Sequence, residues 1–165
     1  MNIFYLHDNP KISAMAMTNK HVVKMIVEST QLLSTAHHVL DNNVNNLPIY
    51  KATHKNHPSA VWVRESMGNY LWLRNHTYFL LQEYAERYNK KPTDHATYKV
   101  WETLKYPPKN IPMTMTTTPI RLAITNVNYH IPNNPIASYR MYYEAEKLRT
   151  DADKSRYHKV LDNYK

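Results

Sequence analysis

One polar stripe in the first third of the chain combines groups that can do acid–base chemistry. His21, Lys24 and Glu28 are three and four residues apart, so on an α-helix they share one face, which Gln31 and Thr35 continue. A carboxylate with partly apolar neighbours and a nearby Lys or His can move a proton or stabilise developing positive charge. The spacing therefore predicts a catalytic carboxylate, and an ordinary amphipathic helix with one Lys24–Glu28 pair is the alternative.

A second polar segment offers basic and amide side chains immediately before a predicted helix start. Lys55, Asn56 and His57 precede Pro58, which suits the first turn of a helix. Free backbone N–H groups and the helix dipole favour an anion at such a position. Contact with a phosphate of DNA and simple capping of the helix are both compatible with this segment.

Aromatic rings alternate with cations on two further helical segments. This mixture suits stacking on bases and contact with phosphates, although tyrosines at helical spacing are also typical of a half-buried core. The predicted DNA contacts are Lys55, Asn56, His57, Arg64, Tyr70, Trp101, Arg140, Tyr143 and Lys147.

Helices must position these groups. The clearest helix is predicted from residue 18 or 19 to residue 40, because Thr18 or Asn19 can cap it and the apolar residues that follow have helical spacing. Residues 41–48 contain four asparagines and form a loop. A second, central helix is predicted as one continuous element over residues 58–89, since large apolar residues surround most of its circumference.

The remainder of the chain is punctuated by proline. A shorter helix is predicted over residues 92–104, followed by an irregular stretch over residues 106–134 that contains five prolines. A final helix is predicted over residues 136–148. The charged tail, residues 149–165, is either helical or frayed and lies peripherally.

Composition narrows the class of protein. The chain has 165 residues, no Cys and a single Gly, which excludes disulfide scaffolds, thiolate metal sites, cysteine nucleophiles and glycine-rich phosphate loops. We expect a single all-α domain over residues 1–165, a compact helical bundle with a long proline-rich loop. The net charge of +8 favours a polyanionic partner such as DNA, although a basic protein without that role is the alternative.

No targeting or membrane segment is expected. The apolar start of the chain is too short for a signal-peptide core, and no stretch approaches the roughly 20 apolar residues that span a bilayer. The predicted location is the cytoplasm, which would be that of the host cell if the protein is viral.

Several motifs together resemble a known family. His21-Val-Val-Lys-Met-Ile-Val-Glu28 places His and Glu seven residues apart, Lys55-Asn56-His57-Pro58 leads into the next helix, and the last helix carries Tyr139-Arg140-Met-Tyr142-Tyr143. With the Met-Asn-Ile-Phe start, this pattern resembles the small helical pyrimidine-dimer DNA glycosylases, also called phage endonuclease V. It looks closer still to a group of bacteriophage proteins that share KHVVKM, QLLSTAH and THKNHPS. The resemblance covers about two thirds of the chain.

The resemblance implies covalent chemistry without a metal or other cofactor. In that family an N-terminal α-amine attacks the sugar C1′, a glutamate on the first long helix assists, and the resulting imine allows strand cleavage. Carried over, Glu28 takes the carboxylate role and is flanked by His21 and Lys24. The family amine is typically that of a threonine exposed by removal of Met, whereas residue 2 here is Asn, whose bulk keeps Met1 in place. The amine of Met1, the amine of Lys24 or an activated water could then attack.

The sequence therefore predicts a metal-independent N-glycosidase that acts on a damaged or modified pyrimidine base extruded from DNA, with or without a lyase step. One alternative is a non-catalytic phage factor that binds DNA, or binds a protein of the host or the phage. A second alternative is a metal phosphoesterase that uses His54, His57 and His95, although no carboxylate accompanies them at a diagnostic spacing.

Overall fold

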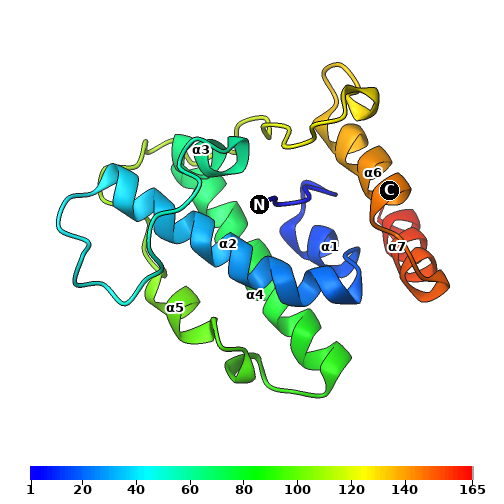
Figure 1. Cartoon of the computed structure of the whole chain (residues 1–165), viewed down its shortest axis with the longest axis horizontal. Helices are drawn as coiled ribbons and strands as arrows, with labels where there is room; N and C mark the ends of the chain where they lie inside the picture. Colours follow the sequence, from blue (N-terminus) through cyan, green and yellow to red (C-terminus); the bar gives the residue numbers. More distant parts are fainter. Residues whose placement is uncertain (165) are drawn as a thin grey trace.

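The computed structural model describes residues 1–164, and within that range it contains helices and loops but no strand (Figure 1). The predicted all-α class is confirmed. The helices are α1 (Pro10–Met15), α2 (Asn19–Leu40), α3 (Pro58–Glu65), α4 (Met67–Tyr88), α5 (Tyr98–Thr103), α6 (Pro135–Glu146) and α7 (Asp151–Asn163), with 3-10 turns η1 (Pro92–Asp94) and η2 (Val127–Tyr129).

The hydrophobic core lies where α2 and α4 cross. Figure 1 shows α2 running over α4, with α1 beside the crossing and α6 and α7 beyond it at one edge of the molecule. Ile26 of α2, Leu73 of α4 and Leu6 of the N-terminal segment are fully buried in one apolar cluster. Burial of this kind supplies most of the favourable free energy of folding, at about 25 cal/mol per Å² of apolar surface. The crossing therefore provides a rigid base for the polar side of α2.

The first long helix forms where the sequence predicts it. The hydroxyl of Thr18 accepts the backbone N–H of His21 and caps α2, as the cap preferences of Thr suggest. The helix ends at Leu40, and the next residue, Asp41, accepts the backbone N–H groups of Lys109 and Asn110. The loop that follows α2 is thereby tied to the long proline-rich segment.

The predicted continuous helix over residues 58–89 is wrong, because the chain breaks at Ser66. That residue is extended, with φ −154° and ψ 157°, and its hydroxyl accepts the backbone N–H of Asn69 to cap a new helix, α4. Ser is among the preferred N-caps, but the helical spacing of the neighbouring apolar residues runs across the break and conceals it.

A strap formed by residues 112–118 explains why the break is tolerated. The carbonyls of Pro112 and Thr114 accept the N–H groups of Met67 and Gly68 at 2.8 and 2.9 Å, so the first turn of α4 has partners outside the helix. The strap lies so close to Gly68 that a Cβ there would collide with the backbone of Met115. These contacts are tertiary and could not be inferred from local spacing.

Both ends of the described chain pack onto the bundle. The N-terminal segment, residues 1–9, is buried over residues 2–6 and leads into the short helix α1, which was not predicted from the sequence. The charged tail, for which the sequence allows either a helix or a frayed end, forms α7. This helix is capped by Thr150 and anchored by the buried ring of Tyr157. Within residues 1–164, no helix combines the length and the apolar character needed to cross a membrane.

Candidate active site

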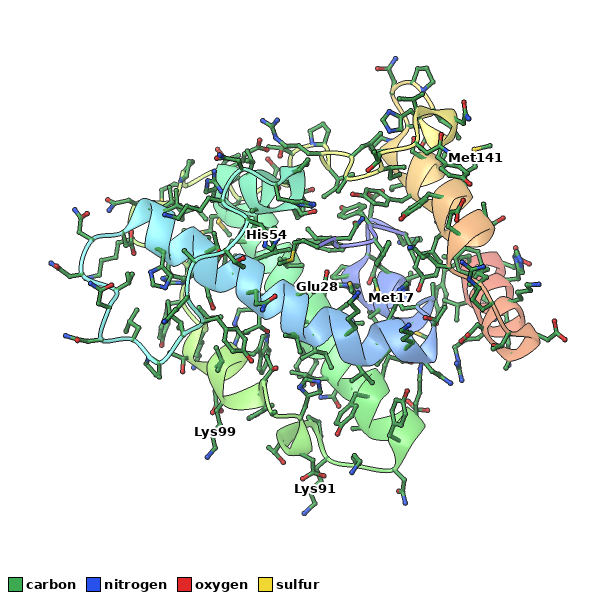
Figure 2. The ribbon with its side chains drawn as sticks, in the orientation of Figure 1. Met17, Glu28, His54, Lys91, Lys99 and Met141 are labelled. Atoms are coloured by element: carbon green, nitrogen blue, oxygen red, sulfur yellow. The ribbon has the colours of Figure 1, made fainter. Side chains whose placement is uncertain are left out.

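Glu28 lies beside the first two residues of the chain. Its Oε2 accepts the backbone N–H of Asn2 at 2.9 Å and is 3.8 Å from the amino nitrogen of Met1. The Met1 side chain is 5% exposed and the Glu28 side chain is 12% exposed. Figure 2 shows Glu28 near the middle of α2, with His54 on the loop that leads to α3. The fold therefore holds an amine next to a mostly buried carboxylate.

Asn2 shapes the segment that delivers this amine. Its side-chain oxygen accepts the N–H groups of Ile3 and Phe4, and its amide group donates to the carbonyl of Ala123. This Asx-type turn is completed by Phe4, whose φ of 55° is unusual for an aromatic residue. From the sequence, Asn2 was considered only as a bulky residue that retains Met1. The turn at Asn2 could have been predicted locally, since an Asn side chain readily accepts the N–H of the residue two positions later.

Lys24 supplies a second cation to Glu28. Its Nζ is 3.5 Å from Oε1, so each carboxylate oxygen faces a different positive group. The Lys24 side chain is 60% exposed, and an exposed pair of this kind contributes little to stability. Lys24 is therefore the solvent-exposed member of this group of charges, and a charged ligand could approach its ammonium.

His57 lies near the amine–carboxylate pair, on the loop that leads into α3. Its Nδ1 accepts the backbone N–H of Ser59 at 3.1 Å and caps α3. Burial lowers the pKa of His57, the positive amine of Met1 and nearby His54 lower it further, and Glu28 opposes them. The ring is thereby favoured in its neutral form.

His21 belongs to an aromatic cluster rather than to the amine–carboxylate pair. Its ring stacks on Phe4 at 4.7 Å between centroids, and its Nδ1 is 2.7 Å from the hydroxyl of Tyr143. The same hydroxyl accepts the N–H of Thr18, so it joins His21 to the start of α2. Burial, followed by the charge of Lys147, lowers the pKa of His21 to about 4.

The residues predicted to contact phosphate differ in their exposure and in the partners that they have within the protein. Lys55 and Asn56 are exposed. Arg64 is half-buried and donates to the carbonyl of Lys55, whereas Arg140 donates to the carbonyl of Leu6. The ammonium of Lys147 lies 5.1 Å from the ring centroid of Tyr142, a cation–π contact. Lys55 is thus free to meet a phosphate, whereas Lys147 is half-buried and the two arginines are partly engaged within the protein.

The three aromatic residues expected to stack on DNA are core residues, which corrects that expectation. Tyr70 and Tyr143 are 0% exposed and Trp101 is 6% exposed. Tyr70 donates to the carbonyl of Leu104, and the guanidinium of Arg74 covers the Trp101 ring at 4.4 Å. Burial raises the pKa of Tyr143 to about 12. Their regular spacing on helices reflects packing, so none presents a free face.

The histidines of the metal alternative do not converge. Among residues 1–164, no three His, Asp or Glu side chains come together in an arrangement that could hold a metal ion. His95 is buried and its Nδ1 accepts the backbone N–H of Thr97, away from His54 and His57. The geometry therefore supplies no ligand set for a metal phosphoesterase in this part of the chain.

Two cavities, of about 280 and 790 Å³, lie away from this site and are lined by other residues, none of them Met1, Glu28 or His57. The smaller lies between the N-terminal segment, the strap and the start of α6, and the larger lies between α4 and α7.

These features define an all-helical protein in which the N-terminal amine pairs with a carboxylate on the first long helix. Residues 1–96, more than half of the chain, match the family model of pyrimidine dimer DNA glycosylase. The chain belongs to this family, whose activity is DNA repair by base excision and whose substrate is DNA. No curated protein and no solved structure matches the chain.

The matched region contains the whole amine–carboxylate site. Met1, Glu28 and His57 lie within residues 1–96, as do Lys24 and the cap of α3. The strap, α6 and α7 lie outside it, and with them Tyr143, Arg140 and Lys147. The family match and the geometry therefore point to the same part of the molecule.

Proposed function

We propose that the protein excises a damaged or modified pyrimidine base from DNA, using the amine of Met1 as nucleophile and Glu28 as its carboxylate partner. One observation carries this proposal: Glu28 Oε2 binds the N–H of Asn2 at 2.9 Å and lies 3.8 Å from the Met1 amino nitrogen. Membership of the pyrimidine dimer DNA glycosylase family supplies the substrate class.

An α-amine suits this reaction at neutral pH. Its reference pKa is near 8, so about a tenth of the amine is neutral at pH 7, far more than for an unperturbed lysine. The amine lone pair forms a bond to C1′, and the bond from C1′ to the base breaks with its electrons leaving on the base. Glu28 accepts the proton that the amine loses and stabilises positive charge that develops at the sugar.

Strand cleavage is a second, separable part of the proposal. Opening of the sugar ring converts the amine adduct into an imine, which makes the C2′ proton easier to remove. Loss of that proton and departure of the 3′ phosphate would then break the strand. If water attacks C1′ instead of an amine, the base is released but no imine forms and this step does not follow.

Lysine side chains would hold the DNA backbone. Exposed Lys24 lies next to Glu28, exposed Lys55 precedes α3, and half-buried Lys147 lies near the Phe4 ring. Each phosphate neutralised by such a lysine releases counterions, so binding should weaken as salt rises. Extruding a base costs a few kcal/mol, which these contacts would have to offset.

A trapping experiment tests the proposal. The full chain is incubated with a duplex that carries one pyrimidine dimer, with or without borohydride, and with the undamaged duplex as control. An adduct that maps to Met1 by mass spectrometry supports amine chemistry, and an adduct at Lys24 would move the nucleophile to that residue. Free base without an adduct would indicate water.

Two controls separate the enzyme from a binding module. A version extended by Gly-Ser before Met1 displaces the amine from Glu28 and should lose the adduct while keeping the fold. Glu28→Gln should bind DNA and fail to release the base. If the unmodified chain binds the duplex but yields neither adduct nor base with any damaged or modified pyrimidine tested, the non-catalytic alternative replaces the proposal.

A further inference from the structure

Asn2 makes four hydrogen bonds directly beside the Met1 amine. Its backbone N–H donates to Glu28 Oε2 at 2.9 Å, and its side-chain nitrogen donates to the Ala123 carbonyl at 3.0 Å. Its side-chain oxygen accepts the N–H groups of the next two residues at 2.8 and 3.0 Å. The side chain is buried, and because its oxygen is used as an acceptor, its nitrogen has to face Ala123.

The carbonyl that accepts the Asn2 amide is itself held by α6. The N–H of Ala123 donates to the hydroxyl of Tyr139 at 3.0 Å, and this hydroxyl donates to the carbonyl of Arg121 at 3.3 Å. Tyr139 is fully buried, so water does not compete for these bonds. One buried hydroxyl therefore fixes the segment to which Asn2 is tied.

A second contact joins α6 to the N-terminal segment. Arg140, the residue after Tyr139, donates from its Nε to the carbonyl of Leu6 at 2.8 Å. Leu6 is fully buried, so this bond secures the segment four residues after Asn2. The first residues of the chain thus lie between α2 and α6 and are held by both helices (Figure 1).

We propose that Asn2 is a positioning residue, whose side-chain amide, tied to Ala123 and through it to Tyr139, orients the Met1 amine for attack. This inference rests on the proposed function and deepens it, since it adds residues beyond the family match over residues 1–96 to the support of the nucleophile. A single hydrogen bond to Glu28 leaves the start of the chain free to turn about that bond. A second anchor on the same residue removes this freedom before the reaction begins.

Two variants break this link from opposite ends. Asn2→Asp keeps the size of the side chain and its acceptor oxygens but has no donor for Ala123, whereas Tyr139→Phe leaves Asn2 intact and removes the hydroxyl that holds Ala123. We expect the single-turnover rate of adduct formation, per folded molecule that retains Met1, to fall about 10- to 100-fold in Asn2→Asp. The fall should be smaller in Tyr139→Phe, and the Kd for damaged DNA should change in neither. An unchanged rate in Asn2→Asp would overturn the proposal.

The added charge of Asn2→Asp can be separated from lost alignment by pH. A negative charge favours the protonated amine, so it slows the reaction at neutral pH whatever the alignment. At high pH the amine is neutral in both proteins and this effect disappears. A rate deficit that persists on the high-pH plateau supports positioning, and a deficit that vanishes there would overturn it.

The double variant tests whether the two residues act through one link. If they do, Asn2→Asp combined with Tyr139→Phe should react as slowly as Asn2→Asp alone, because the link is already broken. Rate losses that multiply would show independent effects and would overturn the proposed link.

Matched controls come from η2, where the same two residue types make similar bonds away from the N-terminus. The side chain of Asn126 accepts the N–H of Asn128, and the hydroxyl of Tyr129 donates to Glu146. Asn126→Asp and Tyr129→Phe should therefore keep the rate of the unmodified chain. Losses in these controls as large as those in Asn2→Asp and Tyr139→Phe would overturn a specific role for the link.

Hydrogen exchange does not depend on DNA chemistry, so it separates failure of this inference from failure of the proposed function. In Tyr139→Phe the backbone N–H of Asn2 should exchange faster than in the unmodified chain, while that of Ile26, in the middle of α2, should keep its rate. Equal exchange at Asn2 in the two proteins would overturn positioning even if no adduct forms in either. Faster exchange at Asn2, with no adduct formed by the unmodified chain on any damaged duplex, would overturn the proposed function and with it the role of Asn2.

Discussion

The two ends of one polar stripe on α2 behave differently. At Glu28 the neighbours are an amine, a backbone N–H and the ammonium of Lys24, whereas at His21 they are the ring of Phe4 and the hydroxyl of Tyr143. The same N-terminal segment reaches both ends, with its amine and an N–H at Glu28 and the Phe4 ring at His21. Three extended residues and two helical turns each span about 10 Å, so the segment presents its amine at one end and an aromatic ring at the other.

This difference shows that a shared helical face does not imply a shared role. The spacing of His21, Lys24 and Glu28 is that of one stripe, but only Lys24 and Glu28 form an ionic group that opens to solvent. His21 is satisfied inside the protein, with its pKa lowered to about 4 chiefly by burial. We therefore expect substitutions at the two ends to separate activity from stability.

The largest expected effect is on catalysis at the Glu28 end. Glu28→Gln retains the shape of the side chain and removes its charge and its capacity to accept a proton, so base release should fall by about 10³-fold. His21→Gln should lower the rate less than tenfold per folded molecule. Single-turnover release of base from damaged duplex measures both. Equal losses in the two variants would mean that the stripe acts as one catalytic unit after all.

The next effect is on stability at the His21 end. Tyr143→Phe removes the hydroxyl that joins Thr18 to His21 and leaves two polar groups without their partner. Each buried unsatisfied group costs about 1–3 kcal/mol, so the free energy of unfolding in denaturant should fall by at least that amount. Adduct formation by the folded fraction should change far less than in Glu28→Gln. A variant as stable as the parent would show that this hydroxyl is not a structural link.

Acid should lower the free energy of unfolding through protonation of His21. The folded pKa of His21 is about 4, below its reference value of 6.5, so the unfolded chain binds more protons between these pH values. Stability contributed by neutral His21 is complete above about pH 6.5 and decreases as pH falls toward 4, by up to about 1.4 kcal/mol per pH unit. Denaturant unfolding at several pH values should show this slope. It should be shallower in His21→Gln, although buried His76, whose pKa is also lowered to about 4, contributes a slope of its own.

The smallest effect is expected at the exposed cation between the two ends. Lys24→Gln should change the free energy of unfolding by less than about 0.5 kcal/mol, because an exposed pair one turn apart on a helix is weak. If Lys24 meets a phosphate, the slope of log Kd against log salt should fall by about one. An unchanged slope would mean that Lys24 pairs with Glu28 and does not contact a phosphate.

Some of the fold could be predicted because it depends on neighbours along the chain. Thr18 caps α2 and the helix ends at Leu40, as the cap preference and the asparagine-rich loop indicated. The break at Ser66 could not be predicted in this way. It depends on carbonyls from the strap about 45 residues away, which bind the first N–H groups of α4 and have no signature near the break.

In the candidate site too, contacts between neighbours along the chain could be predicted and long-range contacts could not. Glu28 and Lys24 were predicted to lie together because their four-residue spacing is a helical contact. The pairing of His21 with Tyr143 and the hydrogen bond from the Asn2 N–H to Glu28 were not predicted, since each joins residues more than 20 positions apart. Aromatic residues such as Tyr70 were assigned to the surface because helical spacing does not say which neighbour covers them.

Local interactions along the chain are enough to specify an all-helical protein, the long helix that carries the acid, and the cations around it, because capping and side-chain spacing act over a few residues. Which of those groups meets an amine and which is enclosed by rings was settled only on folding. The N-terminal segment had to be drawn into the bundle by burial of its apolar residues, and that burial depends on helices contributed by the whole chain.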